Sequence, residues 1–299
     1  MRSSQSTGAL TPQLSVREGT MAGLPQFDHA VINVRYQMDQ AEGSFRDLGF
    51  HLTDRGYHSL GSINHLMMFA TDYIELIGLP EGSKDGNPGR PDIANSALGI
   101  NGLVFKTSDA DETFAHLQEI GMAGDPPKSF SRPVKLSEGT SDARFRTAHL
   151  RRGVFPGGRV YFCEHGTPDL VWRPEWQVHE NGALSMREFV IASENHELEA
   201  KDFAKLLRSD VSGSGDRLSV KLDGAVITVL SPRAYRDRYG ELASPLDERS
   251  TMFGAVVMRV NDLAGIRDIA SAADVLVIDD TNRVVIRQES FDSVLEFVS

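Results

Sequence analysis

The chain has 299 residues, of which 40% are hydrophobic, and it carries a formal net charge of −11. This length holds one large domain or two of ordinary size. The negative charge argues against nucleic acid as a partner, because phosphate binding needs a basic surface. No apolar run approaches the ~18 residues of a membrane-spanning helix. Cys163 is the only cysteine, which excludes an intramolecular disulfide and indicates a reducing, cytoplasmic setting. The acidic balance serves solubility or attracts a cationic ligand.

Residues 1–25 are rich in Ser, Thr, Gln and Gly, and their few apolar residues are too scattered for a signal peptide. We expect a disordered tail there, and Met21 is a candidate for the true start of the protein. The first ordered element is a strand over Phe27–Val34, which carries His29 among apolar neighbours. A helix follows, with apolar residues at helical spacing and a glycine stop at Gly49.

Two further strand-like runs lead to a strand over Tyr73–Gly78, which carries Glu75. These elements make a βαβββ module with a histidine on its first strand and a glutamate on its last. The step from an apolar strand into a helix recurs four times, at Val31–Val34, Val104–Thr107, Val190–Ser193 and Val257–Val260. A repeat of this length excludes a short solenoid repeat and predicts four modules in two paired-module domains.

The expected division of the chain follows from this repeat. It comprises a tail (1–25), a first domain over 26–170 with modules at 26–79 and 98–168, a linker over 171–182, and a second, degenerate domain over 183–299. The stretch Asp85–Asp92 is expected to be the loop between the first two modules. Polar residues 124–142 form an insertion in module two, and a loop of that length is often a lid or binding loop. In the second domain, Asp223-Gly224 between two alternating runs predicts a hairpin.

The strands that carry His29 and Glu75 resemble those of the vicinal-oxygen-chelate superfamily, which includes glyoxalase I, extradiol dioxygenases and bleomycin-resistance proteins. The likeness is strongest over residues 27–180, toward its glyoxalase-like branch. It implies an α+β fold of two domains, each a glyoxalase-like, cup-shaped mixed sheet of paired βαβββ modules. It also implies a divalent metal in the cup, without specifying a substrate.

Aligning the four first strands places His29, Gly102, Glu188 and Ala255 at one equivalent position, from which the superfamily often directs a ligand into the cup. Glu75 is the expected ligand from a fourth strand. This mixture of imidazole and carboxylate suits Zn, Fe, Mn, Ni or Co. A catalytic site needs roughly three protein ligands. For the third we favour His165 at the end of strand 159–165, with Glu164 and His65 as alternatives.

Other roles are assigned around these ligands. Glu75 and Glu164 are the candidate catalytic groups, with Glu164 as a proton shuttle if His165 is a ligand. The candidate substrate-binding residues are His65, Phe69, Tyr73, Phe162 and Trp172. Cys163 is expected to be a packing residue, and the histidines without a supporting constellation are expected on the surface or in structural roles: His51, His58, His116, His149, His179 and His196.

Two functions compete. The first is a metal-dependent enzyme of the vicinal-oxygen-chelate type that acts on a small oxygenated molecule by lyase, isomerase or dioxygenase chemistry. The alternative is a metal-free protein that binds or sequesters a small molecule such as an antibiotic, which the missing ligand at Gly102 favours. The second domain offers only Glu188 and Glu296 at ligand positions, so we expect it to be a scaffold. A homodimer that exchanges modules is a further option of this architecture.

Overall fold

The structure is a computed structural model, and it describes residues 24–83, 89–136, 139–273, 275 and 277–299. The expected N-terminal tail and the candidate start at Met21 lie almost wholly outside these residues. So does the first half of the expected loop Asp85–Asp92, whose last two residues begin a short helix over Pro91–Ala94. None of the helices in the described ranges has the length and apolarity to cross a membrane.

The first half of the chain is an eight-stranded sheet built from two βαβββ modules. Module one consists of β1 (Phe27–Arg35), α1 (Met38–Asp47), β2 (Gly56–Tyr57), β3 (Ile63–Met68) and β4 (Tyr73–Gly78). Module two consists of β5 (Gly99–Lys106), α3 (Ala110–Glu119), β6 (Lys128–Leu136), β7 (Gly139–His149) and β8 (Arg159–His165). A short helix α2 (Pro91–Ala94) precedes module two. The strand order is β2-β3-β4-β1-β5-β8-β7-β6.

The second half repeats this plan. Module three consists of β9 (Ala183–Ser193), α4 (His196–Leu207), β10 (Val211–Ser214), β11 (Arg217–Lys221) and β12 (Val226–Leu230). Module four consists of β13 (Thr251–Val260), α6 (Ala264–Ala272), β14 (Val277–Asp279), β15 (Arg283–Gln288) and β16 (Ser293–Val298). The strand order, β10-β11-β12-β9-β13-β16-β15-β14, is the same as in the first sheet. The predicted fold of four βαβββ modules in two mixed sheets is confirmed.

The strand registers confirm which positions are equivalent. In the first sheet β1 runs antiparallel to β5, with His29 opposite Val104 and Val31 opposite Gly102. Asp28 in β1 and Asn101 in β5 are the unpaired residues at the two register shifts, so exchanging the two modules maps His29 onto Gly102. In the second sheet, Glu188 lies opposite Val257 and Ala255 opposite Val190. These pairings place Glu188 and Ala255 at the same position as His29 and Gly102, as the sequence alignment predicts.

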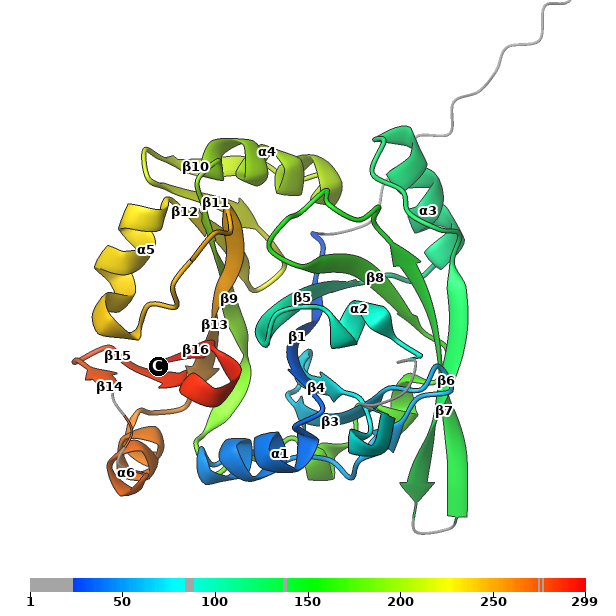
Figure 1. The fold of residues 1–299 in the computed structure, drawn as a ribbon, viewed down its shortest axis with the longest axis horizontal. Helices are drawn as coiled ribbons and strands as arrows, with labels where there is room; N and C mark the ends of the chain where they lie inside the picture. The colour runs from blue at the N-terminus through cyan, green and yellow to red at the C-terminus, as the bar shows by residue number, and fades with distance from the viewer. Residues whose placement is uncertain (1–23, 84–88, 137–138, 274, 276) are drawn as a thin grey trace, which may run out of the picture.

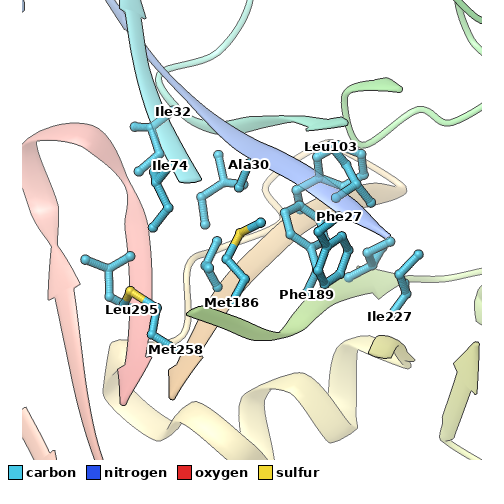
Figure 2. Close-up of a cluster of buried hydrophobic side chains, with 14 of the residues drawn as sticks. Phe27, Ala30, Ile32, Ile74, Leu103, Met186, Phe189, Ile227, Met258 and Leu295 are labelled. Carbon is cyan, nitrogen blue, oxygen red and sulfur yellow. The ribbon is translucent and has the colours of Figure 1, made fainter. Parts of the chain in front are cut away.

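One continuous hydrophobic core joins the two sheets. Figure 1 shows β1 and β5 beside β9 and β13, and the two sheets contact each other through this side. Figure 2 shows the side chains between them, with Phe27, Ala30 and Leu103 facing Met186 and Phe189. Helices α1, α3, α4 and α6 contribute to the same core. The opposite face of each sheet carries a separate cluster of buried side chains. We call this face of the first sheet the first cup and this face of the second sheet the second cup.

Local sequence signals explain most element ends. Gly49 and Gly121 follow helices α1 and α3 and have φ values of +76° and +74°, which glycine adopts without steric cost. The Asp223-Gly224 step joins β11 and β12 as predicted. Only Gly224 of this pair has a positive φ, so the turn does not have the two positive-φ positions that the dipeptide indicates.

Three segments differ from expectation or extend it. Residues 128–136 form strand β6 rather than a loop, because β6 pairs along its whole length with β7 in a long hairpin. The stretch 171–182 packs on module one, where His179 Nε2 lies 2.8 Å from the carbonyl oxygen of Met68. Helix α5 (Pro232–Tyr239) lies between modules three and four, where the first half of the chain has the shorter helix α2 between modules one and two.

Candidate functional site

A β-bulge at the start of β1 creates the centre of the first cup. Phe27 pairs with Phe105 and His29 with the next residue, Val104, so Asp28 is one extra residue in β1. Successive side chains normally point to opposite faces of a strand, and a bulge re-aims them. The bulge brings the neighbours Asp28 and His29 together, and the Asp28 Oδ1 atom lies 2.6 Å from His29 Nδ1.

This contact orients the His29 ring. The Asp28 carboxylate accepts a hydrogen bond from Nδ1–H, which leaves Nε2 as the free nitrogen that faces the cup. His29 Nε2 lies 3.1 Å from the Tyr161 hydroxyl and 3.7 Å from Glu75 Oε2. The ring stacks on Tyr73 at a centroid distance of 4.4 Å. His29 is 4% exposed, so its position is fixed on every side.

Glu75 is held in a similar way. The amide of Asn64 donates a 2.7 Å hydrogen bond to Glu75 Oε1. The other carboxylate oxygen, Oε2, faces His29. Glu75 and His29 therefore each use one polar atom for a supporting hydrogen bond and present the other to the same point.

Asp28 also binds His165 from module two. Its second oxygen, Oδ2, lies 2.7 Å from His165 Nε2. Burial alone would raise the pKa of Asp28, but the charges and hydrogen bonds of His165 and His29 hold it well below its usual range. Asp28, Cys163 and His165 form a group whose donor atoms lie within 4.8 Å of one another and could hold a metal ion. Against this use, burial raises the pKa of the Cys163 thiol well above 9.0, whereas a metal binds the thiolate.

A pocket opens from His29 and Glu75 with a cavity of about 90 Å³. A water needs ~10–15 Å³ on the same measure, so the cavity accommodates a small molecule. Aromatic rings form part of the wall, and Phe130 stacks on Phe145 at 5.1 Å. Four cationic side chains also line it: Arg90, Lys128, Arg132 and Arg159. This lining has the opposite sign to the chain as a whole and does not suit the cationic ligand considered from composition.

The structure places some of the expected site residues at this pocket and others elsewhere. His29, Glu75 and Tyr73 line it. His165 lies behind it, bonded to Asp28 and in contact with the ring of Trp172 at 4.6 Å. Trp172 therefore packs beside the site without lining the cavity.

The remaining expected residues lie on the core side of the sheet. The Glu164 carboxylate accepts a hydrogen bond from the Ala110 amide and pairs with Arg146. His65 Nδ1 donates to the Thr53 carbonyl, and its Nε2 lies 3.1 Å from Glu42 of α1. Phe69 and Phe162 belong to the shared core. These four residues, Glu164, His65, Phe69 and Phe162, are not brought to the pocket.

The comparison with family models identifies the chain. The model described as "Glyoxalase-like domain" matches residues 27–207, which is more than half of the sequence. The protein belongs to the glyoxalase-like domain family. No curated protein sequence matches it.

Solved structures agree with the family on the fold. A hypothetical protein from Staphylococcus aureus is similar with a TM-score of 0.65 at 13% identity, covering 92% of this chain and 99% of its own. A mutant of 4-hydroxymandelate synthase from Streptomyces coelicolor is similar at 0.57 and 12% identity, with 92% of both chains covered. A fusion of a xylose isomerase-like TIM barrel with 4-hydroxyphenylpyruvate dioxygenase reaches 0.55 at 11% identity, covering 92% of this chain and 49% of its own.

The register of module two corrects one alignment made from sequence. In this glyoxalase-like sheet His29 pairs with Tyr73 and Val31 with Glu75. The matching pairs in module two are Gly102 with Arg159 and Val104 with Tyr161. Tyr161 therefore stands at the position equivalent to Glu75, and the alignment that placed Glu164 there is wrong.

Gly102 cannot be a vacant ligand position that a small change would refill. A Cβ atom on Gly102 would lie 2.7 Å from the Cβ of Val31, so β1 and β5 approach each other too closely for a side chain. Of the two module-two positions that correspond to His29 and Glu75, only the second consequently carries a polar side chain, the phenol of Tyr161. Burial raises its pKa well above 10.0, so this phenol stays protonated.

The second cup has two glutamates at the corresponding positions, but the chain fills it. Glu296 pairs with Val257, which is equivalent to the pairing of Glu75 with Val31. The guanidinium of Arg238 from α5 donates two hydrogen bonds to Glu188, at 2.8 and 2.9 Å, and also bonds Glu296 at 2.8 Å. Tyr239 donates to Glu296 from the same helix.

Sequence reasoning missed several residues of the first cup. Asp28 was missed because simple alternation places it on the opposite face from His29. His58 and His149 line the pocket, although both were expected in structural roles or on the surface. Arg132 and Lys128 lie in the predicted polar insertion, whose composition was the available signal.

Proposed function

We propose that the protein is an enzyme that transfers protons to and from a small oxygenated molecule bound in the first cup, with His29 and Glu75 as the central residues and a divalent metal as cofactor. One observation carries this proposal. His29 Nε2 and Glu75 Oε2 lie 3.7 Å apart on one cavity, and Asp28 and Asn64 hold the opposite atoms of the two groups.

The residues present fit a metal site with two protein ligands. A metal-bound histidine usually donates its other ring N–H to a carboxylate, and a ligating carboxylate is itself hydrogen-bonded, as Asp28 and Asn64 provide here. His29 and Glu75 would hold the ion, and the remaining positions would belong to water and substrate. A bound divalent ion would supply Lewis-acid polarisation of a substrate oxygen.

The chain's own groups support proton transfer. Glu75 Oε2 and His29 Nε2 are the proton acceptors that face the cavity, and the Tyr161 hydroxyl is a donor beside them. A tyrosine that remains protonated can donate a hydrogen bond to an oxygen that gains negative charge during the reaction. The buried rings of Tyr73 and Tyr161 keep bulk water away from these atoms.

His165 does not complete an oxygenase-type metal site. Non-haem iron oxygenases use two histidines and one carboxylate on one face of the metal. His165, the second histidine expected as a ligand, directs Nε2 to Asp28, and the second histidine whose Nε2 approaches Glu75 is His58, at 3.9 Å from Oε1. Two of the similar solved structures are named as a synthase and a dioxygenase, and these names support an enzyme function for this chain.

Metal analysis of the purified full-length chain tests the proposal. We expect about one first-row divalent ion per chain, either as purified or after incubation with Zn, Fe, Mn, Ni or Co salts. His29→Ala and Glu75→Gln should lose it. Glu164→Gln, which removes a carboxylate on the other side of the same sheet, should retain it. Wild-type protein that binds none of these ions would overturn the metal part of the proposal.

The alternative is a metal-free binding protein of the same fold. The absence of a ligand side chain at Gly102 and the phenol at Tyr161 favour it, because neither of these two positions in module two supplies an ordinary metal ligand. In that case chelators would leave ligand binding unchanged, and His29→Ala would weaken binding only through lost contacts.

A further inference from the structure

The lining of the first cup includes charged residues that the proposed chemistry does not use. Beside His29, Glu75 and Tyr161, the same cavity is lined by Arg90, Arg132 and Arg159. A protein of net charge −11 gains nothing in solubility from cations directed inward. The positions of these three arginines therefore call for a separate explanation.

Arg132 is the most informative of them. It is 4% exposed, and its NH2 atom is buried without a hydrogen-bond partner. Among the described residues, no carboxylate lies within ion-pair distance of it. Burial lowers the pKa of its guanidinium, yet arginine stays charged in proteins. The backbone also makes room for it, since a Cβ atom on Gly56 would lie 2.6 Å from Arg132 Cδ.

The guanidinium of Arg159 has hydrogen-bond partners for only part of its N–H groups. Its NH1 atom donates a 3.0 Å hydrogen bond to Asp92, while Nε and NH2 are buried without partners. Arg90 differs from both, because it binds Asp92 through Nε and NH2 at 2.9 and 2.8 Å. Asp92 thus holds Arg90 and one arm of Arg159 in place. Arg132 and Arg159 therefore both line the cavity and both keep buried N–H groups without an acceptor among the described residues.

A buried, unpaired guanidinium costs several kcal/mol, and folded proteins keep such groups where function requires them. Guanidinium groups bind carboxylates through paired, charge-assisted hydrogen bonds. We propose that Arg132 and Arg159 bind the carboxylate of the substrate, so that the ligand of this pocket is a small carboxylic acid whose oxygenated part faces His29, Glu75 and Tyr161. The placement of the oxygenated part rests on the proposed function, whereas the binding of the carboxylate by the two arginines does not.

Size and charge select among anions. The cavity of about 90 Å³ excludes nucleotides and other large anions. Glu75 carries a negative charge in the same pocket and opposes a dianion more strongly than a monoanion. The stacked rings of Phe130 and Phe145 offer an apolar surface to the rest of the molecule. A monoanionic carboxylate with a short apolar or aromatic body meets all three conditions.

Calorimetry on the full-length chain tests this with paired probes: acetate, butyrate and benzoate against acetamide, butyramide and benzamide, with inorganic phosphate as a further arm. We expect at least one carboxylate to bind and its amide to bind at least tenfold more weakly. Arg132→Gln should lower carboxylate affinity at least tenfold. Arg146→Gln is the matched control, because Arg146 lies on the core side of the sheet and pairs with Asp111 and Glu164.

Several results would overturn the inference. Equal binding of carboxylates and amides would show that charge does not drive binding, and binding of phosphate alone would contradict a carboxylate ligand. Unchanged affinity in Arg132→Gln would show that Arg132 does not bind the carboxylate. If Arg132→Gln does not fold, Arg159→Gln provides the same comparison. Glu75→Gln separates the two proposals: it should lose metal but keep carboxylate binding, so either proposal can fail without the other.

Discussion

The two cups of this protein share one fold and one strand register, yet the buried charges at their centres have different partners. In the second, Arg238 from α5 pairs with Glu188 and Glu296 and fills the space between them. In the first, Arg132 has no counter-ion among the described residues, and His29 and Glu75 face a cavity. The difference teaches that a binding site in this fold depends on whether the chain supplies its own partner for the buried charges.

The largest expected effect comes from opening the second cup. Arg238→Ala would remove the closest cation from the buried Glu188 and Glu296, leaving Arg217 and Arg283 at 3.8 and 3.5 Å, and breaking a buried ion pair costs about 3–5 kcal/mol. Urea denaturation would measure the loss. Arg233→Ala on the same helix is the control, since Arg233 is exposed and its loss should change stability far less. Equal losses in both variants would contradict a closed, ion-paired second cup.

A pH series tests whether His149, which lines the pocket of the first cup, is held neutral in the folded protein. Burial and then the nearby Arg159 guanidinium lower the pKa of His149 from 6.5 to about 4. Below pH 6.5 His149 binds a proton in the unfolded chain but stays neutral in the folded chain, so the free energy of unfolding falls as pH drops toward 4. The total decrease in the free energy of unfolding is up to about 3 kcal/mol.

The measurement compares wild type with His149→Gln, because other groups titrate in the same range. Burial, for example, raises the pKa of Asp72 to about 6, which makes its contribution change in the opposite direction. The stability difference between the two proteins should change steadily between pH 6.5 and 4. A constant difference over that range would show that His149 is not held neutral.

The support given to Glu75 predicts a smaller change. Asn64→Ala removes the hydrogen bond to Glu75 Oε1 without touching the oxygen that faces His29. Loss of such a supporting partner typically weakens metal binding 10–100-fold. Titration of metal-depleted protein would measure it. Ser219→Ala in the second sheet should leave the affinity unchanged, and equal weakening in both would assign the effect to general destabilisation.

The smallest predicted effect has the opposite sign to the first. Arg132→Met in the ligand-free protein removes a buried charge without a partner and should raise the free energy of unfolding by about 0.5–2 kcal/mol. Comparing this variant with Arg238→Ala tests whether the buried arginine stabilises the second cup and destabilises the ligand-free first cup. A loss of stability in Arg132→Met would mean that Arg132 supports the fold.

The repeat and the position of the first cup could be predicted from sequence because both depend on periodic burial. The four first strands, the helices after them and the equivalence of His29, Gly102, Glu188 and Ala255 all follow from alternating apolar positions. Glycines at helix ends added the boundaries. These signals are local, so a single sequence carries them.

The rest of the site depends on features that alternation cannot reveal. One extra residue in β1 places Asp28 beside His29, and a bulge leaves no clear mark in the sequence. A three-residue difference in register separates Glu164 from Tyr161 as the equivalent of Glu75. Arg132 and Arg238 reach their cups from β6 and α5, which vary between modules, so the repeat gave no reason to inspect them.

The shared core has a consequence for work on separate halves of the molecule. The family match ends at residue 207, after α4, whereas Phe189 of β9 packs against Phe253 of β13 and faces Phe27 across the core. A fragment cut at that residue would expose these rings as a broad apolar surface and would tend to self-associate. The second half thus covers the apolar face of the first, and the pocket-bearing sheet has to be produced together with it.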